Sequence, residues 1–380
     1  MLTPHRLSAG LAYIALAVSL IGLPVAAQAL EGVVRDHDGD GIAGIRVIVE
    51  NGGARYEAET DGGGAFEFEG VQVFNQAFLK LKGGNGVGRV VVPAYKAVEP
   101  LELEYPVISE VVLLHDNDQH FDWNFVGAIQ SEIHRVRSEH ANVFHFNAGD
   151  IFVRHPHRWG EPNNHNFGWY AEQALFTIAT MNKLGYDAMA AGNHEMDHVE
   201  HYTRQALETA EFPVLAANMD IRTERLPHMP PYTVLETKEG YTIAVLGLST
   251  GNFDGVERLD PIETTQKYLH LAEKHDLFIA VTHIGVSNDR ELAEAVPELD
   301  VIIGGHSHTL LDEAEMVNGV LVAQAGGGGH QFDPEKPAYL GKVTLALENG
   351  RPVEKSGFVT EFTAAGVTPL GGALAEAAAN

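Results

Sequence analysis

The middle of the chain reads Ala188-Met-Ala-Ala-Gly-Asn-His-Glu195, an apolar run followed at once by glycine and polar residues. A short apolar run bounded by glycine is typical of a buried strand, and the polar residues then lie on the turn at its C-terminal end. Four other polar segments, most of them also preceded by an apolar run, are Asp118-Gln-His120, Gly149-Asp150, Thr282-His283 and Gly305-His-Ser-His308. Because ligands of open α/β sheets collect at the C-terminal ends of strands, the five segments predict one shared site.

These segments carry seven side chains with the oxygen and nitrogen donors that divalent metals bind. The seven are Asp118, His120, Asp150, Asn193, His283, His306 and His308. Any one segment alone has an ordinary structural explanation, such as a strand-end turn, a helix cap or a flexible loop. Their joint occurrence in this order predicts a site for two divalent metals. Two metals a few ångströms apart are suited to the hydrolysis of phosphate esters.

The hydrophobic pattern divides the chain near residue 107. After that point Val126, Ile129, Ile133 and Val136 mark one face of an amphipathic helix, and strand-like and helix-like segments then alternate. Further helices are expected at 171–183, 199–210, 263–275 and 288–295, and strands at 143–146, 188–191, 214–217, 241–248, 277–281, 300–303, 320–325 and 341–347. This alternation predicts a layered α/β domain with late strands added without helices between them.

Residues 30–104 predict a small all-β sandwich domain. Apolar and polar residues alternate in Ile45-Arg-Val-Ile-Val49 and Ala65-Phe-Glu-Phe-Glu69, and glycine-rich turns separate such runs. With Glu31-Gly-Val-Val-Arg-Asp36 before them, these segments resemble the carboxypeptidase-regulatory-like, transthyretin-like β-sandwich family. That resemblance implies a fold and no catalytic activity. It leaves open a protein or cell-envelope partner for the domain.

The first 29 residues predict a secretory signal peptide. A weakly basic start with Arg6 precedes the apolar run Leu11-Ala-Tyr-Ile-Ala-Leu-Ala-Val-Ser-Leu-Ile-Gly-Leu23, and cleavage is expected after Ala27-Gln-Ala29. An uncleaved membrane anchor is the alternative, although the apolar run is short for a span. We therefore expect a periplasmic or secreted protein with no membrane span after cleavage.

Composition excludes several classes of function. The 380 residues carry a formal net charge of −27, which argues against a nucleic-acid duplex or an anionic membrane as partner. The same charge would repel a phosphate substrate except where bound cations reverse the local field. The chain contains no cysteine, so disulfides and thiolate-bound zinc are excluded.

Residues 107 to about 350 resemble the calcineurin-like metallophosphoesterase family, and within it the catalytic domain of the 5'-nucleotidase branch. Val112-Leu-Leu-His-Asp-Asn-Asp-Gln-His120 is similar to the first signature of that branch, and Tyr186-Asp-Ala-Met-Ala-Ala-Gly-Asn-His-Glu-Met-Asp197 is similar to the second. The resemblance implies a layered β-sandwich flanked by helices (αββα). It also implies hydrolysis of a phosphate ester by a hydroxide held between two divalent metals, for which Mn, Zn and Fe all suit the ligands.

The family pattern assigns a role to each residue of the site. One metal receives Asp118, His120, Asp150 and His308, and the other receives Asp150, Asn193, His283 and His306, so that Asp150 bridges the pair. His194 is assigned to stabilising the transition state and the leaving oxygen, and Asp197 is expected to accept a hydrogen bond from its ring. We interpret Glu195 as an acid that opens the following helix, and His115 as lying behind the ligands.

The resemblance has limits. Asp116, Phe121 and Met196 replace residue types usual in the two signatures, although none of them is a ligand. Residues 351–380 are expected to be a C-terminal tail, too short for the domain that clamps the base in 5'-nucleotidases, so nucleotide specificity is not expected to transfer. The expected substrate is a nucleotide or a related organic phosphate. Two alternatives stay open, a dimanganese hydrolase acting on a protein-bound sulfur substrate and a non-catalytic metal-binding scaffold.

Overall fold

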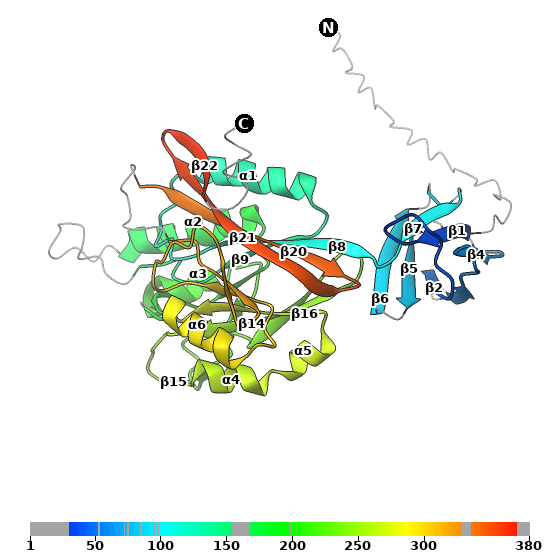
Figure 1. Cartoon of the computed structure of the whole chain (residues 1–380). Coiled ribbons are helices and arrows are strands. Elements are labelled where there is room, and N and C mark those ends of the chain that lie inside the picture. The colour runs from blue at the N-terminus through cyan, green and yellow to red at the C-terminus, as the bar shows by residue number, and fades with distance from the viewer. Residues whose placement is uncertain are drawn as a thin grey trace, which may run out of the picture.

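The computed structural model describes residues 30–370 apart from 52–53, 72, 74–75, 84–85, 94–95, 98, 154–166, 198 and 328–335. The expected signal peptide at 1–29 lies outside the described residues. Within them, no helix combines the length and the apolar character that crossing a membrane requires. The chain forms a large body and, at its N-terminal end, a smaller one (Figure 1).

Two facing sheets build the large body. The first has seven strands in the order β11-β10-β9-β8-β20-β21-β22, and the second has six in the order β13-β14-β16-β17-β19-β18. The strands of the first sheet are β8 (Ile108–Asp116), β9 (Val143–Asn147), β10 (Ala188–Ala190), β11 (Val214–Leu215), β20 (Ala338–Glu348), β21 (Arg351–Thr363) and β22 (Gly366–Leu370). Those of the second are β13 (Tyr232–Glu236), β14 (Thr242–Ser249), β16 (Leu277–His283), β17 (Val301–Gly304), β18 (Glu315–Val317) and β19 (Val320–Ala323).

The core between the two sheets comes from parallel strands that are apolar on both faces. β8 pairs in parallel with β9, and β14, β16 and β17 are parallel neighbours. Leu113 and Phe146 of the first sheet pack with Val245 and Ile279 of the second, and all four are fully buried. Burial on both faces is why these strands appear in the sequence as continuous apolar runs.

Helices cover the outer face of each sheet. Against the seven-stranded sheet lie α1 (Val126–Glu139), α2 (Phe167–Leu184) and α3 (Arg204–Leu207), and against the six-stranded sheet lie α4 (Pro261–Lys267), α5 (His270–Lys274) and α6 (Val286–Ala295). Ile133 of α1 packs with Leu114 of β8, and Leu292 of α6 packs in the cluster of Leu246 in β14. The order helix, sheet, sheet, helix confirms the predicted αββα fold class.

Several elements differ from their predicted form. The segment expected to be helical at 199–210 consists of a π-helix (Val199–Thr203) followed by α3, and the helix expected at 263–275 is divided into α4 and α5. A short ribbon of β12 (Met219–Ile221) and β15 (Val256–Arg258) was not expected. Residues 351–370, assigned from sequence to a tail, form β21 and β22 and extend the seven-stranded sheet beyond β20.

The small body is all-β, as predicted for residues 30–104. Its two sheets have the orders β4-β1-β7 and β3-β2-β5-β6. The strands are β1 (Leu30–Arg35), β2 (Arg46–Asn51), β3 (Ala54–Glu59), β4 (Ala65–Phe68), β5 (Gln76–Gly83), β6 (Gly86–Pro93) and β7 (Leu101–Glu104). Val34, Val47 and Leu79 are buried at its centre. Its membership of the carboxypeptidase-regulatory-like family stays a prediction.

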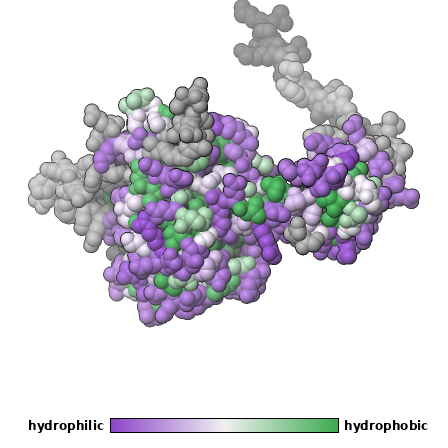
Figure 2. Space-filling model, viewed as in Figure 1, coloured by the Kyte–Doolittle hydropathy of each residue, from purple (hydrophilic) through white to green (hydrophobic). Residues whose placement is uncertain are grey.

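Arg89 of β6 joins the small body to the large one. Its Nη1 lies 3.0 Å from Asp276 Oδ2, and its guanidinium carbon lies 4.7 Å from the centre of the Tyr241 ring. Its backbone N–H donates to the Tyr241 hydroxyl at 2.9 Å. Hydrophilic residues cover most of the face drawn in Figure 2, in keeping with the net charge of −27.

Candidate metal centre

Ligand-type side chains gather where β8, β9, β16 and β17 end. Three groups have donor atoms that all lie within 4.8 Å of one another, namely Asp118, His120 and His308; His120, Asp150 and His194; and Asp150, His283 and His306. His120 and Asp150 each belong to two groups, so the three groups form one continuous centre. The structure therefore brings together six of the seven predicted ligands in these groups, with His194 beside them.

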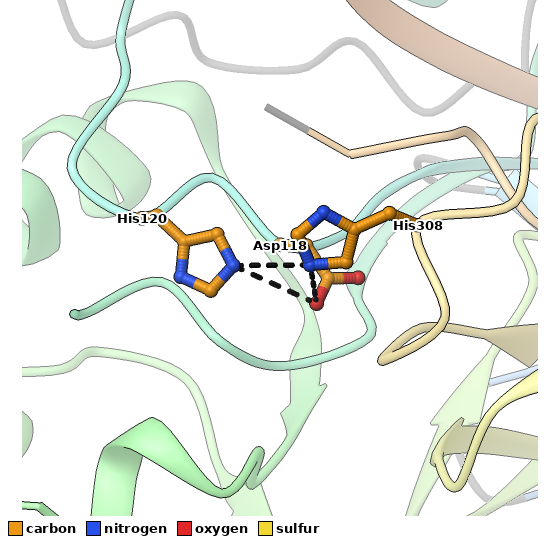
Figure 3. A group of neighbouring side chains, drawn as sticks. All are labelled: Asp118, His120 and His308. Atoms are coloured by element: carbon orange, nitrogen blue, oxygen red, sulfur yellow. Dashed lines mark hydrogen bonds and ion pairs between the residues drawn. The ribbon is translucent and has the colours of Figure 1, made fainter. Parts of the chain in front are cut away.

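The first group is shown in Figure 3, where the donor atoms of its three side chains are turned toward one another. His308 Nε2 lies 3.1 Å from Asp118 Oδ1 and 3.2 Å from His120 Nε2. His120 Nε2 lies 3.9 Å from the same Asp118 oxygen. Asp118 and His120 follow β8, whereas His308 follows β17, so two sheets contribute to this group.

The group of Asp150, His283 and His306 centres on His283, which ends β16. Its Nε2 lies 3.1 Å from Asp150 Oδ2, 3.2 Å from Asn193 Oδ1 and 3.3 Å from His306 Nδ1. Asn193 is thus the seventh predicted ligand to reach the centre. Asp150 contacts both groups of side chains, as expected of a carboxylate that bridges two metals.

The donor set fits divalent cations. Asp118 is fully buried, and its Oδ1 faces two imidazole nitrogens without accepting a hydrogen bond from either in this geometry. Two facing imidazole nitrogens and a carboxylate oxygen bind one another poorly, since a neutral imidazole has one N–H and one lone pair. A cation between them satisfies all three lone pairs, and imidazole and carboxylate suit Mn, Fe and Zn.

Five of the predicted ligands have a left-handed backbone conformation, which residues other than glycine adopt infrequently. Their φ angles are 55° for Asp118, 49° for His120, 56° for Asp150, 76° for His306 and 52° for His308. Backbone hydrogen bonds hold these turns, among them Asp118 N–H to Gly149 O at 2.9 Å and His120 N–H to Asp150 O at 3.1 Å. Such strain concentrates at functional sites, where the surrounding fold maintains it.

Two of the histidines are oriented by backbone carbonyls. His283 Nδ1 lies 2.7 Å from Ala148 O, and His120 Nδ1 lies 2.8 Å from Phe152 O. Each carbonyl can accept only an N–H, so it fixes the tautomer in which Nδ1 donates and the Nε2 lone pair faces the centre. Both rings are therefore prepared to coordinate through Nε2.

The charges of the centre shift its acid–base equilibria. Burial acts to raise the pKa of Asp150, but the adjacent His283, together with His194 and His120, outweighs it and holds that pKa well below its usual range. Burial acts to lower the pKa of His283, yet the charge and hydrogen bond of Asp150 raise it to about 10. Asp150 is thus an anion that attracts positive charge, which bound cations would supply in place of protons.

His194 lies at the margin of the centre and is paired with Asp197. Its Nδ1 is 2.8 Å from Asp197 Oδ2, and its Nε2 is 3.6 Å from Asp150 Oδ2. Burial acts to lower the pKa of His194, but the hydrogen bond to Asp197 and the charge of Asp150 raise it above its ordinary value. The geometry agrees with the predicted contact between the two residues, while their catalytic roles stay predictions.

Glu195 differs from its interpretation as a helix-opening acid. It is fully buried, and its carboxylate accepts backbone N–H groups of Gly192, Asp150 and Ile151 at 2.5, 2.9 and 3.0 Å. The only sequence signal for this is its position three residues after the glycine that ends a strand. Its burial raises its pKa to about 7, and the charge of Asp150 acts in the same direction.

Asn147 was also missed, because it lies inside a strand pattern. Its Nδ2 donates to Asp116 Oδ1 at 2.8 Å and to Gln119 Oε1 at 2.7 Å, and its Oδ1 accepts the Gly149 N–H at 2.8 Å. It therefore joins the turn after β8 to the turn after β9. His115 is buried and belongs to none of the three groups, in agreement with its expected place behind the ligands.

Comparison with known proteins identifies the class. A family model described as calcineurin-like phosphoesterase matches residues 112–310, about half of the chain. The chain belongs to the calcineurin-like phosphoesterase family.

Two curated relatives and one solved structure indicate the branch. The chain is 30% identical over 287 residues to the trifunctional nucleotide phosphoesterase protein YfkN of Bacillus subtilis (strain 168), covering 63% of this chain and 18% of that protein. It is 40% identical over 151 residues to the 5'-nucleotidase of Vibrio cholerae serotype O1, covering 33% of this chain and 27% of that protein. The 5'-nucleotidase precursor of Thermus thermophilus has a TM-score of 0.56 at 27% identity, covering 66% of this chain and 54% of that one. The chain spans about half or less of the length of these relatives.

Proposed function

We propose that the protein is a metal-dependent phosphoester hydrolase that holds two divalent cations and acts on a nucleotide or a related organic phosphate. The observation that carries the proposal is the convergence at the strand ends of seven side chains with oxygen or nitrogen donors, Asp150 among them. The similarity to a nucleotide phosphoesterase and a 5'-nucleotidase supports the substrate class.

The residues of the chain divide into two sets of ligands. Asp118, His120 and His308 would hold one cation, while Asn193, His283 and His306 would hold the other, with Asp150 shared. Two divalent cations bound there would lower the pKa of a water molecule and polarise the phosphoryl oxygens. The donor set does not distinguish Mn, Zn and Fe.

His194 would act on the leaving oxygen. Burial acts to lower the pKa of His194, but the hydrogen bond to Asp197 and the charge of Asp150 raise it above its ordinary value and so favour the protonated ring. Its Nδ1–H donates to Asp197, which leaves Nε2–H directed toward the centre, where it can stabilise negative charge or give up its proton. Asp197 would hold the ring in that orientation.

We further propose that residues 1–29 are a signal peptide, that the protein is periplasmic or secreted, and that 30–104 and 107–350 are separate domains. The leader sequence and the change of periodicity near 107 support these assignments. Mass spectrometry of the exported protein would test the first, since cleavage after Ala29 predicts a mature chain that begins at Leu30.

Substitution of the shared carboxylate tests the proposed chemistry. We expect Asp150→Asn to lower turnover by roughly 10³-fold, because the loss of the bridging charge costs several kcal/mol in the transition state. The measurement is hydrolysis by the metal-free protein reconstituted with Mn²⁺, across monoesters, diesters, nucleotides and nucleotide sugars. Asp300→Asn, at the opposite end of β17, is the control and should keep its activity. An Asp150→Asn protein with wild-type rate and metal content would contradict the proposal.

A further inference from the structure

The carboxylate of Glu195 ties the turn that carries Asp150 to the turn that carries Asn193. Its Oε2 accepts the N–H groups of Asp150 and Gly192, and its Oε1 accepts that of Ile151, with Phe152 N–H at 3.4 Å. It is fully buried. Three short bonds from a buried carboxylate to backbone N–H groups are charge-assisted and are roughly twice as strong as neutral ones.

The bonds act on backbone that has little freedom to shift by itself. Asp150 is held at a φ of 56°, which its side chain disfavours, and its N–H is one of those bound by Glu195. A Cβ on Gly192 would lie 2.2 Å from Asp150 Oδ1 and 2.7 Å from Glu195 Oε2. The two turns and the carboxylate are therefore in direct contact, with no space for another side chain.

The segment that carries Glu195 also holds the side chain of Asp150. The His194 N–H donates to Asp150 Oδ1 at 2.8 Å, which leaves Oδ2 facing His283 Nε2 at 3.1 Å. The backbone and the side chain of Asp150 are thus both fixed by the segment that includes Glu195. A small displacement of the Glu195 carboxylate would therefore move the carboxylate of Asp150, which both sets of proposed ligands share.

We propose that Glu195 is a positioning residue that sets the place of Asp150, and with it the affinity for the two cations. This rests on the proposed function, since it needs cations bound at the centre. Glu195 touches neither a cation nor the substrate in this account. It acts through the backbone of the turn at 149–152.

Glu195→Gln tests the proposal with an isosteric side chain. The amide nitrogen cannot accept an N–H, so either Gly192 and Asp150 or Ile151 lose their acceptor. We expect Mn²⁺ to bind about 10–100-fold more weakly, the range typical when a group that orients metal ligands is removed. The measurement is calorimetric titration of the metal-free full-length protein with Mn²⁺, well below its unfolding temperature.

Two further variants separate positioning from folding. Met196→Leu changes a buried apolar neighbour at nearly constant volume and should leave the Mn²⁺ affinity unchanged. Glu195→Asp keeps the charge but shortens the side chain, so its Mn²⁺ affinity should lie between those of the wild type and Glu195→Gln. It replaces Glu195→Gln in the test if that variant does not fold. Thermal unfolding of each metal-free variant is recorded alongside.

The outcomes distinguish the two proposals. Weaker Mn²⁺ binding by folded Glu195→Gln or Glu195→Asp, with Met196→Leu unchanged, supports the positioning role. A lower unfolding temperature with wild-type Mn²⁺ affinity in both Glu195 variants overturns it and leaves the proposed function standing. A wild-type protein that binds neither Mn²⁺ nor Zn²⁺ nor Fe²⁺ in the same titration overturns both.

Discussion

His194 Nε2 lies 3.6 Å from Asp150 Oδ2, yet replacing His194 should have a different consequence from replacing Asp150. His194→Ala removes the proposed donor to the leaving oxygen and none of the proposed ligands. We therefore expect metal binding to be kept while turnover falls by about 10²–10⁴-fold, the range for loss of a general acid. Turnover and metal content measured on the same sample separate the two effects. Full activity in His194→Ala would show that the assigned role is wrong.

His115 should make the stability of the protein depend on pH. Burial lowers its pKa to about 4, against the opposing charge of Asp116, so the folded state favours the neutral ring. The resulting stability is complete above the unfolded-state pKa of about 6.5 and is lost as the pH falls toward 4, by about 2 kcal/mol between pH 7 and 5.

Urea unfolding of the metal-free protein at pH 7 and pH 5 measures this effect. His115→Phe keeps a ring against Gly341 without a titrating group, and it should lose about 2 kcal/mol less than the wild type over that interval. Equal losses in the two proteins would assign the acid sensitivity to other groups.

At the same scale, sequence reasoning picked out the candidate ligands that the structure brings together, but it missed the residues that hold their turns in place. Asp118 and His283 belong to residue types that bind metal, and their positions after apolar runs placed them at strand ends. Glu195 and Asn147 act through backbone N–H groups, whose positions depend on turns that no residue pattern specifies. That is why both were overlooked although both contact the turn of Gly149 and Asp150.

Among the elements, β14 of one sheet approaches β11 of the other at Gly247. A Cβ there would lie 2.2 Å from Leu215 Cβ and 2.7 Å from its carbonyl carbon, which no change of rotamer relieves. We expect Gly247→Ala to lower the free energy of unfolding by about 1–3 kcal/mol, the usual cost of an overpacked core. Gly127→Ala in α1 adds a Cβ with nothing within 4 Å and should be neutral or stabilising. Denaturant unfolding compares the two, and equal stability would contradict the tight contact between sheets.

The elements that could be predicted are those buried on both faces. β16 and β17 are wholly buried and appear as apolar runs. β21 mixes exposed and buried positions, with Val353 58% exposed, and its pattern gives no clear period. Its place in the sheet depends on pairing with β20, a contact that local sequence does not reveal.

At the scale of the whole molecule, Arg89 fixes the small body against the large one. We expect Arg89→Ala to loosen this contact, because it removes a partly buried ion pair with Asp276 and the stacking on Tyr241. Limited proteolysis should then cut faster at residues 105–107, between the two bodies, and small-angle scattering should show a larger radius of gyration. Arg55→Ala, which removes an exposed ion pair with Glu57 inside the small body, is the control. Unchanged cleavage and scattering in Arg89→Ala would show that other contacts hold the two bodies.

The two bodies were predictable from the change of periodicity near residue 107, whereas their contact was not. Arg89 lies 187 positions from Asp276 and 152 from Tyr241, and nothing in the residues around it marks a partner so distant in sequence. The metal centre is equally non-local, since Asp118 and His308 are far apart in the chain. Its residues could still be picked out from the sequence, because the five segments together, in this order, carry residue types that bind divalent metals.

The measurement that tests the central claim most directly is metal stoichiometry coupled to turnover in the wild-type protein. The purified protein is stripped of metal and titrated with Mn²⁺, while hydrolysis of a nucleotide monoester is followed in the same samples. The account predicts no turnover without metal, two Mn²⁺ bound per chain at saturation, and activity that rises with occupancy. Phosphoester hydrolysis that persists without metal, or a protein that binds neither Mn²⁺ nor Zn²⁺ nor Fe²⁺ when each is titrated in turn, would contradict it.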